Sequence, residues 1–369
     1  MSKKIINEIF LLRSVACLSI VLNHAMERSL NNPSELMNAG IMLLTFGTPT
    51  FIFISEFILA KSYPDKLPAQ FWSKRVKYIL MPYFLFGIFY AIAKGFEQAL
   101  SNGEVVIMAI GHNILRHILL AEYHGYFIII IFQFYLLHFF FSKYLKKWSP
   151  KWVIGLSLMI NIVYLGFFNF VDPIPTIVGN YIWSWFYWIP FFGWIFYFTV
   201  AYYSGIYFTV FTQVLAKYYK WILAAPLVLA IVSIILFTNG FYPVISSKKI
   251  DMVFFTTSMI LFIYFVSTKV RTVPKIIIRI SQYSFGIYLF HPFFMALISI
   301  MLTGPLKGTH FIGEFVVYFV GSIFLSMIAT YLINQIPYGY FFIGKIGMGI
   351  TDKEKESSPN VLTNTTKLT

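Results

Sequence analysis

An arginine and a histidine stand inside an apolar run near the start of the chain. Arg13 and His24 both lie within residues 9–26, IFLLRSVACLSIVLNHAM, which reads as a membrane-spanning helix. Their spacing corresponds to three helical turns plus about 20°, so the two side chains share one face, about 16 Å apart along the axis. Ionisable residues inside a bilayer are costly and rarely face lipid. We therefore expect this stripe to face the protein interior or a water-filled cavity.

The two residue types suit the transfer of a group between the two sides of a membrane. An arginine can hold an anionic donor, and an imidazole can take a proton from a hydroxyl or briefly carry the transferred group. The pattern leaves both roles open for His24. Glu27 follows three residues later, where it either orients the imidazole or is an ordinary residue at the helix end. In the alternative interpretation, Arg13 extends to the inner surface and His24 only caps the outer end.

The elements that position these residues are membrane helices. The 369-residue chain is 59% hydrophobic and 11% charged, with a mean hydropathy of +0.75, whereas soluble domains carry about 25% charged residues. The composition predicts an all-α, polytopic integral membrane protein that has the lipid bilayer as a partner. Ten segments are long and apolar enough to cross a bilayer: 9–28, 41–60, 78–97, 125–142, 152–169, 189–208, 221–238, 252–268, 283–303 and 313–333.

The basic residues predict the orientation of these spans. With the N-terminus inside, 21 of the 28 Lys and Arg residues fall on the inner side, and positive charge favours the cytoplasmic side. Both termini are therefore expected in the cytoplasm, with Arg13 in the inner leaflet and His24 in the outer one. The net charge of +14 reflects topology, and no nucleic-acid partner is expected. We expect residues 1–345 to form one transmembrane domain and 346–369 a polar, disordered tail.

The Arg-x10-His pattern and five further segments, in order, resemble the membrane-bound acyltransferase-3 family. These segments are FGTPTFIFISEFILA at 46–60, FWSKRVKYILMPYFLFG at 71–87, EYHGYFIIIIFQFYLL at 122–137, FGWIFYFTVAYYSG at 192–205 and SQYSFGIYLFHPFFM at 281–295. The resemblance implies transfer of an acyl group, acetyl or succinyl, from cytoplasmic acyl-CoA to a hydroxyl of an extracytoplasmic glycan. It also implies a multi-pass protein of a bacterial cell membrane, with acyl-CoA as a substrate and no tightly bound cofactor.

Four basic residues are candidates to hold the donor. Lys74, Arg75 and Lys77 lie on the inner side with Arg13, and guanidinium groups grip the phosphates of coenzyme A in a bidentate way. Arg75-Val76-Lys77 departs from the Arg-x-x-Arg pattern that is commoner in the family, and an ordinary positive-inside loop is the alternative explanation. Glu56 stands where the family usually has a small residue. We expect it to neutralise and orient Arg13 at a similar depth, or else to extend towards the inner surface.

Three residues are candidates for an outer cavity or an acceptor site. His291 lies about halfway along the predicted ninth span, and His124 and Tyr126 lie at the start of the fourth. Each can instead serve as an ordinary polar loop or hydrogen-bonding residue. The histidines between residues 112 and 124 lack the i, i+4 spacing of a helical metal pair, so no metal is expected.

Two functions compete for these features. The first is a glycan O-acyltransferase, and the second is an exporter or flippase of a polysaccharide or lipid-linked sugar. An arginine inside and a histidine outside favour the enzyme, because a translocation path would keep polar residues along several helices. A structural or sensor protein would leave Arg13 and His24 without a purpose.

Overall fold

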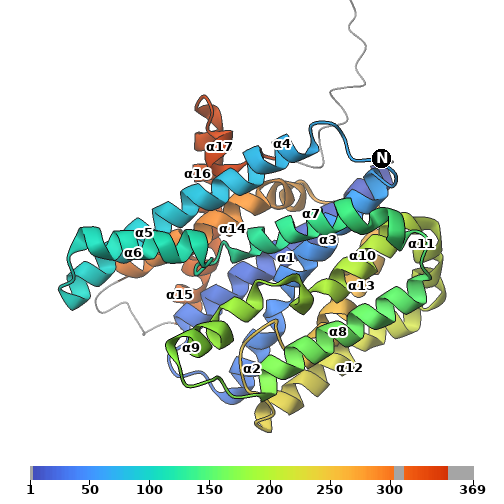
Figure 1. The fold of residues 1–369 in the computed structure, drawn as a ribbon, viewed down its shortest axis with the longest axis horizontal. Helices are drawn as coiled ribbons and strands as arrows, with labels where there is room; N and C mark the ends of the chain where they lie inside the picture. The colour runs from blue at the N-terminus through green and yellow to red at the C-terminus, as the bar shows by residue number, and fades with distance from the viewer. Residues whose placement is uncertain (1–2, 303–310, 348–369) are drawn as a thin grey trace, which may run out of the picture.

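Helix α1 (Lys3–Ser29) lies among three other long helices in the computed structural model, which describes residues 3–302 and 311–347. It packs against α3 (Gly47–Ser62), α13 (Ile250–Lys269) and α14 (Lys275–Met301), and Figure 1 shows it crossing the middle of the molecule. The protein interior thus surrounds the helix that carries the arginine and the histidine. The predicted tail lies outside the described residues from 348 onwards.

The predicted all-α, polytopic membrane architecture is confirmed. Among the described residues, nine helices or helix runs are long and apolar enough to cross a membrane, or ten if a bent pair counts as one span. The nine are Asn7–Ser29, Glu35–Ser62, Phe71–Asn102, Tyr126–Leu145, Pro150–Phe170, Tyr219–Thr238, Ile250–Lys269, Lys275–Met301 and Phe311–Gln335. In order, these spans are α1, α2–α3, α4–α5, α7, α8, α12, α13, α14 and α15–α16. Three of them consist of two α-helices each, whose remaining bounds are Glu35–Leu43 for α2, Phe71–Arg75 for α4, Met81–Asn102 for α5, Phe311–Val316 for α15 and Ser322–Gln335 for α16.

The span predicted at 189–208 is not one straight helix. Helix α10 (Ile195–Ile206) and α11 (Phe208–Lys217) meet at an angle of 103°. Pro190 stands between two short 3-10 turns, so the α-helix begins only after residue 194, and Tyr207 leaves helical geometry at φ −100° and ψ 45°. The chain therefore turns sharply where the hydropathy pattern predicts a continuous span.

Short helices complete the fold at the ends of the spans. They are α6 (Val106–Leu119), α9 (Ile177–Ser184) and α17 (Tyr340–Ile343). Helix α6 follows α5 along the chain and runs beside it in Figure 1. His117 of α6 places its Nδ1 atom 3.0 Å from the Gly87 carbonyl oxygen, and the Tyr83 hydroxyl donates to the His117 carbonyl at 2.9 Å. These buried hydrogen bonds hold α6 against α5.

Candidate active site

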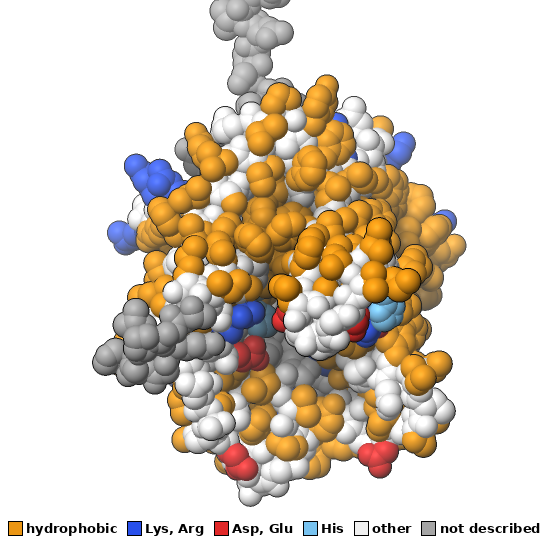
Figure 2. All heavy atoms as spheres, turned by 90° about the vertical axis from the view of Figure 1, so that its left-hand side faces the viewer, with side chains coloured by type: hydrophobic (Ala, Val, Ile, Leu, Met, Phe, Trp, Pro, Cys, Tyr) orange, Lys and Arg blue, Asp and Glu red, His pale blue; other side chains and the backbone are white. Residues whose placement is uncertain are grey.

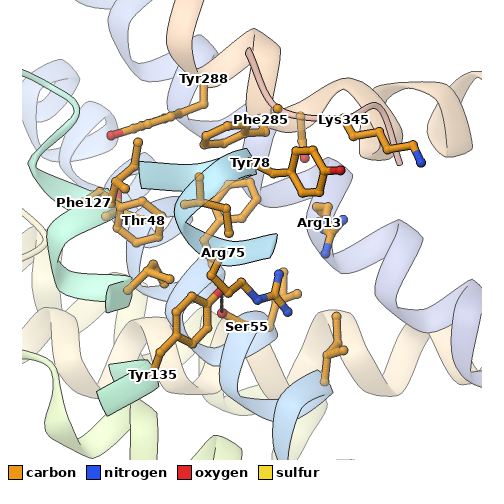
Figure 3. Close-up of a pocket in the computed structure, with 18 of the residues that line it drawn as sticks. Arg13, Thr48, Ser55, Arg75, Tyr78, Phe127, Tyr135, Phe285, Tyr288 and Lys345 are labelled. Atoms are coloured by element: carbon orange, nitrogen blue, oxygen red, sulfur yellow. Dashed lines mark hydrogen bonds between the residues drawn. The ribbon is translucent and has the colours of Figure 1, made fainter. Parts of the chain in front are cut away.

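A cavity of about 160 Å³ lies between α1, α3, α7 and α14. Three cations line it: Arg13, Arg75 and Lys345. Figure 3 shows Arg13 and Lys345 on the right of this cavity and Phe127 and Thr48 on the left. The charge pattern predicts a cytoplasmic position for these three cations. The structure therefore puts Arg13 beside a cavity, as its position in an apolar helix predicted.

Only one of the three clustered basic residues after the second span lines the cavity. Lys74 is exposed, and the Lys77 ammonium lies 4.9 Å from the Tyr340 ring centroid and 4.7 Å from that of Phe341. Successive residues on a helix point about 100° apart, and the π-helical turn at Val76–Leu80 changes the register again. The structure therefore places Arg75 at the cavity, and Lys74 and Lys77 outside its lining.

Lys345 is a cavity residue that the sequence analysis did not single out as a candidate. It follows Gly344, which ends α17 with φ +71°. A Cβ atom on Gly344 would lie 2.7 Å from the Tyr78 carbonyl oxygen, so glycine allows both this backbone angle and the close approach. The glycine before Lys345 is the one sequence signal for this contact.

Glu56 does not pair with Arg13, so that prediction is wrong. Its Oε1 atom lies 2.7 Å from Nδ1 of His138, and the two side chains are 1% and 3% exposed. Ser55, one residue earlier, faces the cavity and donates to the Tyr135 hydroxyl at 3.2 Å. Because the next residue on a helix turns by about 100°, Glu56 points to α7 (Tyr126–Leu145) and the buried His138 instead.

Aromatic rings line the end of the cavity opposite Arg13 and Lys345 (Figure 3). Tyr288 and Phe127 line the cavity and their ring centroids are 5.9 Å apart, while Phe127 lies 6.2 Å from Phe51. The Tyr288 hydroxyl donates to the His124 carbonyl oxygen. We refer to Phe51, Phe127 and Tyr288 as the aromatic layer. It separates the cavity from three histidines that do not line it: His24, His124 and His291.

The three histidines form a cluster beyond the aromatic layer. The ring centroids of His24 and His291 are 5.4 Å apart with an interplanar angle of 25°, and His124 lies 6.2 Å from His291. Glu27 Oε2 lies 3.0 Å from His24 Nδ1, and the two side chains are 39% and 45% exposed. The predicted Glu27 contact is thus present, and it leaves Nε2 of His24 available for chemistry.

One side of the molecule is hollowed (Figure 2). Figure 2 views the side of the molecule that carries α6 and α9, and it shows basic, acidic and histidine side chains around a central hollow. Within residues 3–302 and 311–347, no group of three or more His, Cys, Asp and Glu side chains is arranged to hold a metal ion.

Proline positions the ring of His291. Nδ1 of His291 lies 3.0 Å from the Ile287 carbonyl oxygen and 2.9 Å from that of Tyr288. Pro292 has no backbone N–H, so the Tyr288 carbonyl four residues earlier is free to accept from the imidazole. The Nε2 atom of His291 is buried and has no hydrogen-bond partner among the described residues. The His-Pro sequence therefore fixes the tautomer that leaves Nε2 unprotonated.

His124 contributes an uncharged ring to the cluster. It lies in the turn before α7, with its ring centroid 4.6 Å from that of Tyr90. Burial is the main cause that lowers the pKa of His124 to about 3, and the nearby His24 lowers it further. His124 is therefore neutral at physiological pH.

Tyr126 lies at neither the cavity nor the histidine cluster. Its hydroxyl accepts from Nζ of Lys248 at 3.3 Å, and this ammonium lies 3.7 Å from the Trp188 ring centroid. Tyr126 is the first residue of α7, where Phe127 takes the face towards the cavity. The structure therefore does not make Tyr126 a cavity residue.

Burial lowers the pKa of the Lys248 amine to about 7.

Comparisons with known proteins bear on this geometry. A family model described as an acyltransferase domain matches residues 6–331. A Bacillus subtilis protein named "Putative membrane-bound acyltransferase YfiQ" is 37% identical over 92% of this chain and 95% of its own length. Staphylococcus aureus proteins named "Probable poly-beta-1,6-N-acetyl-D-glucosamine export protein" are 30% identical over 79% of this chain and 82% of theirs. No solved structure matches.

Proposed function

The chain belongs to the acyltransferase-3 family of membrane proteins, and from this premise we propose that it acylates an extracytoplasmic glycan. The donor is cytoplasmic acyl-CoA, and the transferred group is acetyl or succinyl. The observation that carries the proposal is the arrangement of the site: a cavity with three cations at one end, and a histidine cluster beyond its other end.

The cationic end of the cavity suits the donor. Arg13 and Arg75 are always charged and can grip phosphate oxygens in a bidentate way, and Lys345 adds a point charge. Neither arginine has a carboxylate within ion-pair distance in the described part of the chain. Their charges are therefore free for the phosphates of coenzyme A. The rest of the lining is mostly apolar and aromatic, which suits the thin arm that carries the thioester.

The aromatic layer lies between the thioester and the histidines. For transfer, the acyl group must pass Tyr288 and Phe127, and the Tyr288 hydroxyl must release the His124 carbonyl oxygen that it now binds. This barrier would keep water from the thioester until an acceptor is bound.

His24 is the base in this proposal. Its Nε2 atom takes the proton of the glycan hydroxyl while that oxygen attacks the thioester carbonyl carbon. The carbon–sulfur bond then breaks, and the imidazolium returns the proton to the leaving thiolate. The Glu27 carboxylate, 3.0 Å from Nδ1, stabilises the imidazolium and holds the ring. His291 stacks on the same ring and limits its rotation.

Export of a glycan is the second candidate, because relatives at 30% identity are named export proteins. The cavity argues against it. Its volume is about 160 Å³ and it ends at the aromatic layer, whereas a polymer strand needs a continuous path that is wide enough for sugar rings.

The experiment that tests the proposal is mass spectrometry of isolated cell-surface glycans. It compares cells with the wild type, cells with His24→Ala at matched expression, and cells without the protein. His112→Ala is the matched control, because His112 is an exposed histidine of α6. We expect the mass of an acyl ester only with the wild type and His112→Ala, at unchanged amounts of surface polymer. Unchanged esters together with polymer retained inside the cell would refute the enzyme and support export.

A further inference from the structure

A second cavity, of about 310 Å³, lies away from the candidate active site, between α8 (Pro150–Phe170), α12 (Tyr219–Thr238) and the start of α13. It lies at the ends of these helices that the charge pattern assigns to the outer side. Its volume is in the range of pockets that hold small organic molecules. It shares no lining residue with the cavity that holds Arg13.

The lining of this cavity includes a pair of opposite charges, a buried lysine and a partly buried aspartate. Lys249 is 1% exposed, and its Nζ atom lies 3.8 Å from Oδ1 of Asp251, a distance too long for a hydrogen bond. The closest polar contact of Nζ in the described residues is the Met42 sulfur at 3.1 Å, which is a weak acceptor. Oδ2 of Asp251 is buried with no hydrogen-bond partner among the described residues. An ammonium with three donors and a carboxylate oxygen are thus left under-satisfied at one site.

Most of the other lining residues are apolar, and some of them lie on the molecular surface. Leu229, Val232 and Leu236 of α12 line one wall, at the spacing of a single helix face. Leu229 lies about 14 Å deeper in the membrane than Thr238, the last residue of α12. Phe170 and Phe254, which also line the cavity, are 53% and 40% exposed on the molecular surface. The cavity therefore extends from the membrane interface into the hydrocarbon region along an exposed wall.

We propose that this cavity binds one phospholipid of the outer leaflet whose headgroup carries hydrogen-bond donors, such as phosphatidylglycerol. The phosphate oxygens accept from Lys249, and a headgroup hydroxyl donates to Oδ2 of Asp251. One acyl chain lies along Leu229, Val232 and Leu236. This ligand matches both the charge pair at the interface and the apolar wall below it. Phosphatidylcholine has the phosphate but lacks the donor for Asp251.

Thermal unfolding of the purified full-length protein in detergent tests this site. The additives are phosphatidylglycerol, phosphatidylcholine and soluble glycerol phosphate, each at the same concentration. At about 100 times the dissociation constant, phosphatidylglycerol is expected to raise the Tm of the wild type by about 4 °C. Lys220→Met is the control, because Lys220 is an exposed lysine at the opposite end of α12.

Two variants remove the site in different ways. Lys249→Met removes the phosphate partner, and Val232→Phe fills the cavity without changing any charge. Because Val232 is 43% exposed, the larger ring has room to leave the core undisturbed. We expect both variants to lose the shift with phosphatidylglycerol, while Lys220→Met keeps it. If Lys249→Met does not fold, the loss of the Tm shift in Val232→Phe still tests the site.

Three results would overturn the proposal. If phosphatidylglycerol raised the Tm of Val232→Phe as much as that of the wild type, the lipid would bind elsewhere. Equal shifts with phosphatidylcholine and phosphatidylglycerol would show that the headgroup donor has no role. A full shift with glycerol phosphate alone would identify a site for a soluble phosphate rather than a lipid.

Discussion

Replacing Arg75 with methionine should weaken the binding of acyl-CoA far more than the same change at Lys74. The two residues are neighbours in one basic segment, and the sequence alone treats them alike. In the structure Arg75 lines the cavity with Arg13 and Lys345, and Lys74 is exposed. The pair therefore separates a specific phosphate contact from the general positive charge of an inner loop.

The expected magnitude follows from the surroundings of Arg75. Its guanidinium lies 5.1 Å from the ring centroids of both Phe71 and Tyr135, and no carboxylate pairs with it in the described part of the chain. The rings hold the side chain in place while its hydrogen bonds remain free. A hydrogen bond to a charged group contributes about 1.5–3 kcal/mol, which corresponds to a roughly 10- to 150-fold rise in Kd for Arg75→Met.

The assay is calorimetric titration of acyl-CoA into each purified variant in detergent, at two salt concentrations. We expect Arg75→Lys to lie between the wild type and Arg75→Met, because lysine keeps the charge but loses the bidentate geometry. For Lys74→Met we expect a change in Kd of less than about 2-fold, which disappears at high salt because exposed charges are screened. Unchanged Tm values for the variants would show that they fold.

Equal losses of affinity in Lys74→Met and Arg75→Met would refute this reasoning. They would mean that the inner surface attracts the donor through its summed charge, and that the cavity beside Arg13 holds no phosphate. Full affinity in Arg75→Met would refute it as well.

Three further predictions concern groups near the site. His138→Leu leaves the Glu56 carboxylate buried alone and should cost about 3–5 kcal/mol of unfolding free energy. Adding Glu56→Leu to this variant should restore most of the lost stability. If thermal unfolding shows no such recovery in the double variant, the pairing is contradicted. Tyr288→Phe removes the hydroxyl that binds the His124 carbonyl. The rate of acyl-CoA hydrolysis without acceptor, measured by the release of free thiol, should therefore rise about 5-fold. An unchanged rate would show that Tyr288 forms no barrier. Burial holds the pKa of Lys248 at about 7, below about 10.4 in the unfolded chain, so the wild type should gain stability as pH rises between these values. Lys248→Met should therefore raise Tm at pH 6 and have little effect near pH 10, and a Tm difference that does not change with pH would contradict this.

The amino-acid sequence determined the class of the protein and the character of its first helix. Apolar runs of about 20 residues form membrane helices because the bilayer leaves backbone groups no other partners. The shared face of Arg13 and His24 and the contact between His24 and Glu27 follow from spacing within one helix. The membrane orientation of the spans is likewise predicted from the sequence alone, by the distribution of Lys and Arg between the connecting segments.

Tertiary packing decided which side chains meet. Sequence places Glu56 at the depth of Arg13, but the rotation of α3 about its axis turns it to His138 on α7. The hydropathy pattern also did not predict the 103° bend after α10, because it measures how apolar a segment is and not the direction of its helix axis.

The two ends of the candidate site come from distant parts of the chain. His291 meets His24 because α14 packs against α1, and Lys345 reaches the cavity from the end of α17. Periodicity shows which residues of one helix share a face. The rotation of that face relative to its neighbours depends on how all the helices pack together, so the pairing of charges and rings across helices is decided only in the folded protein.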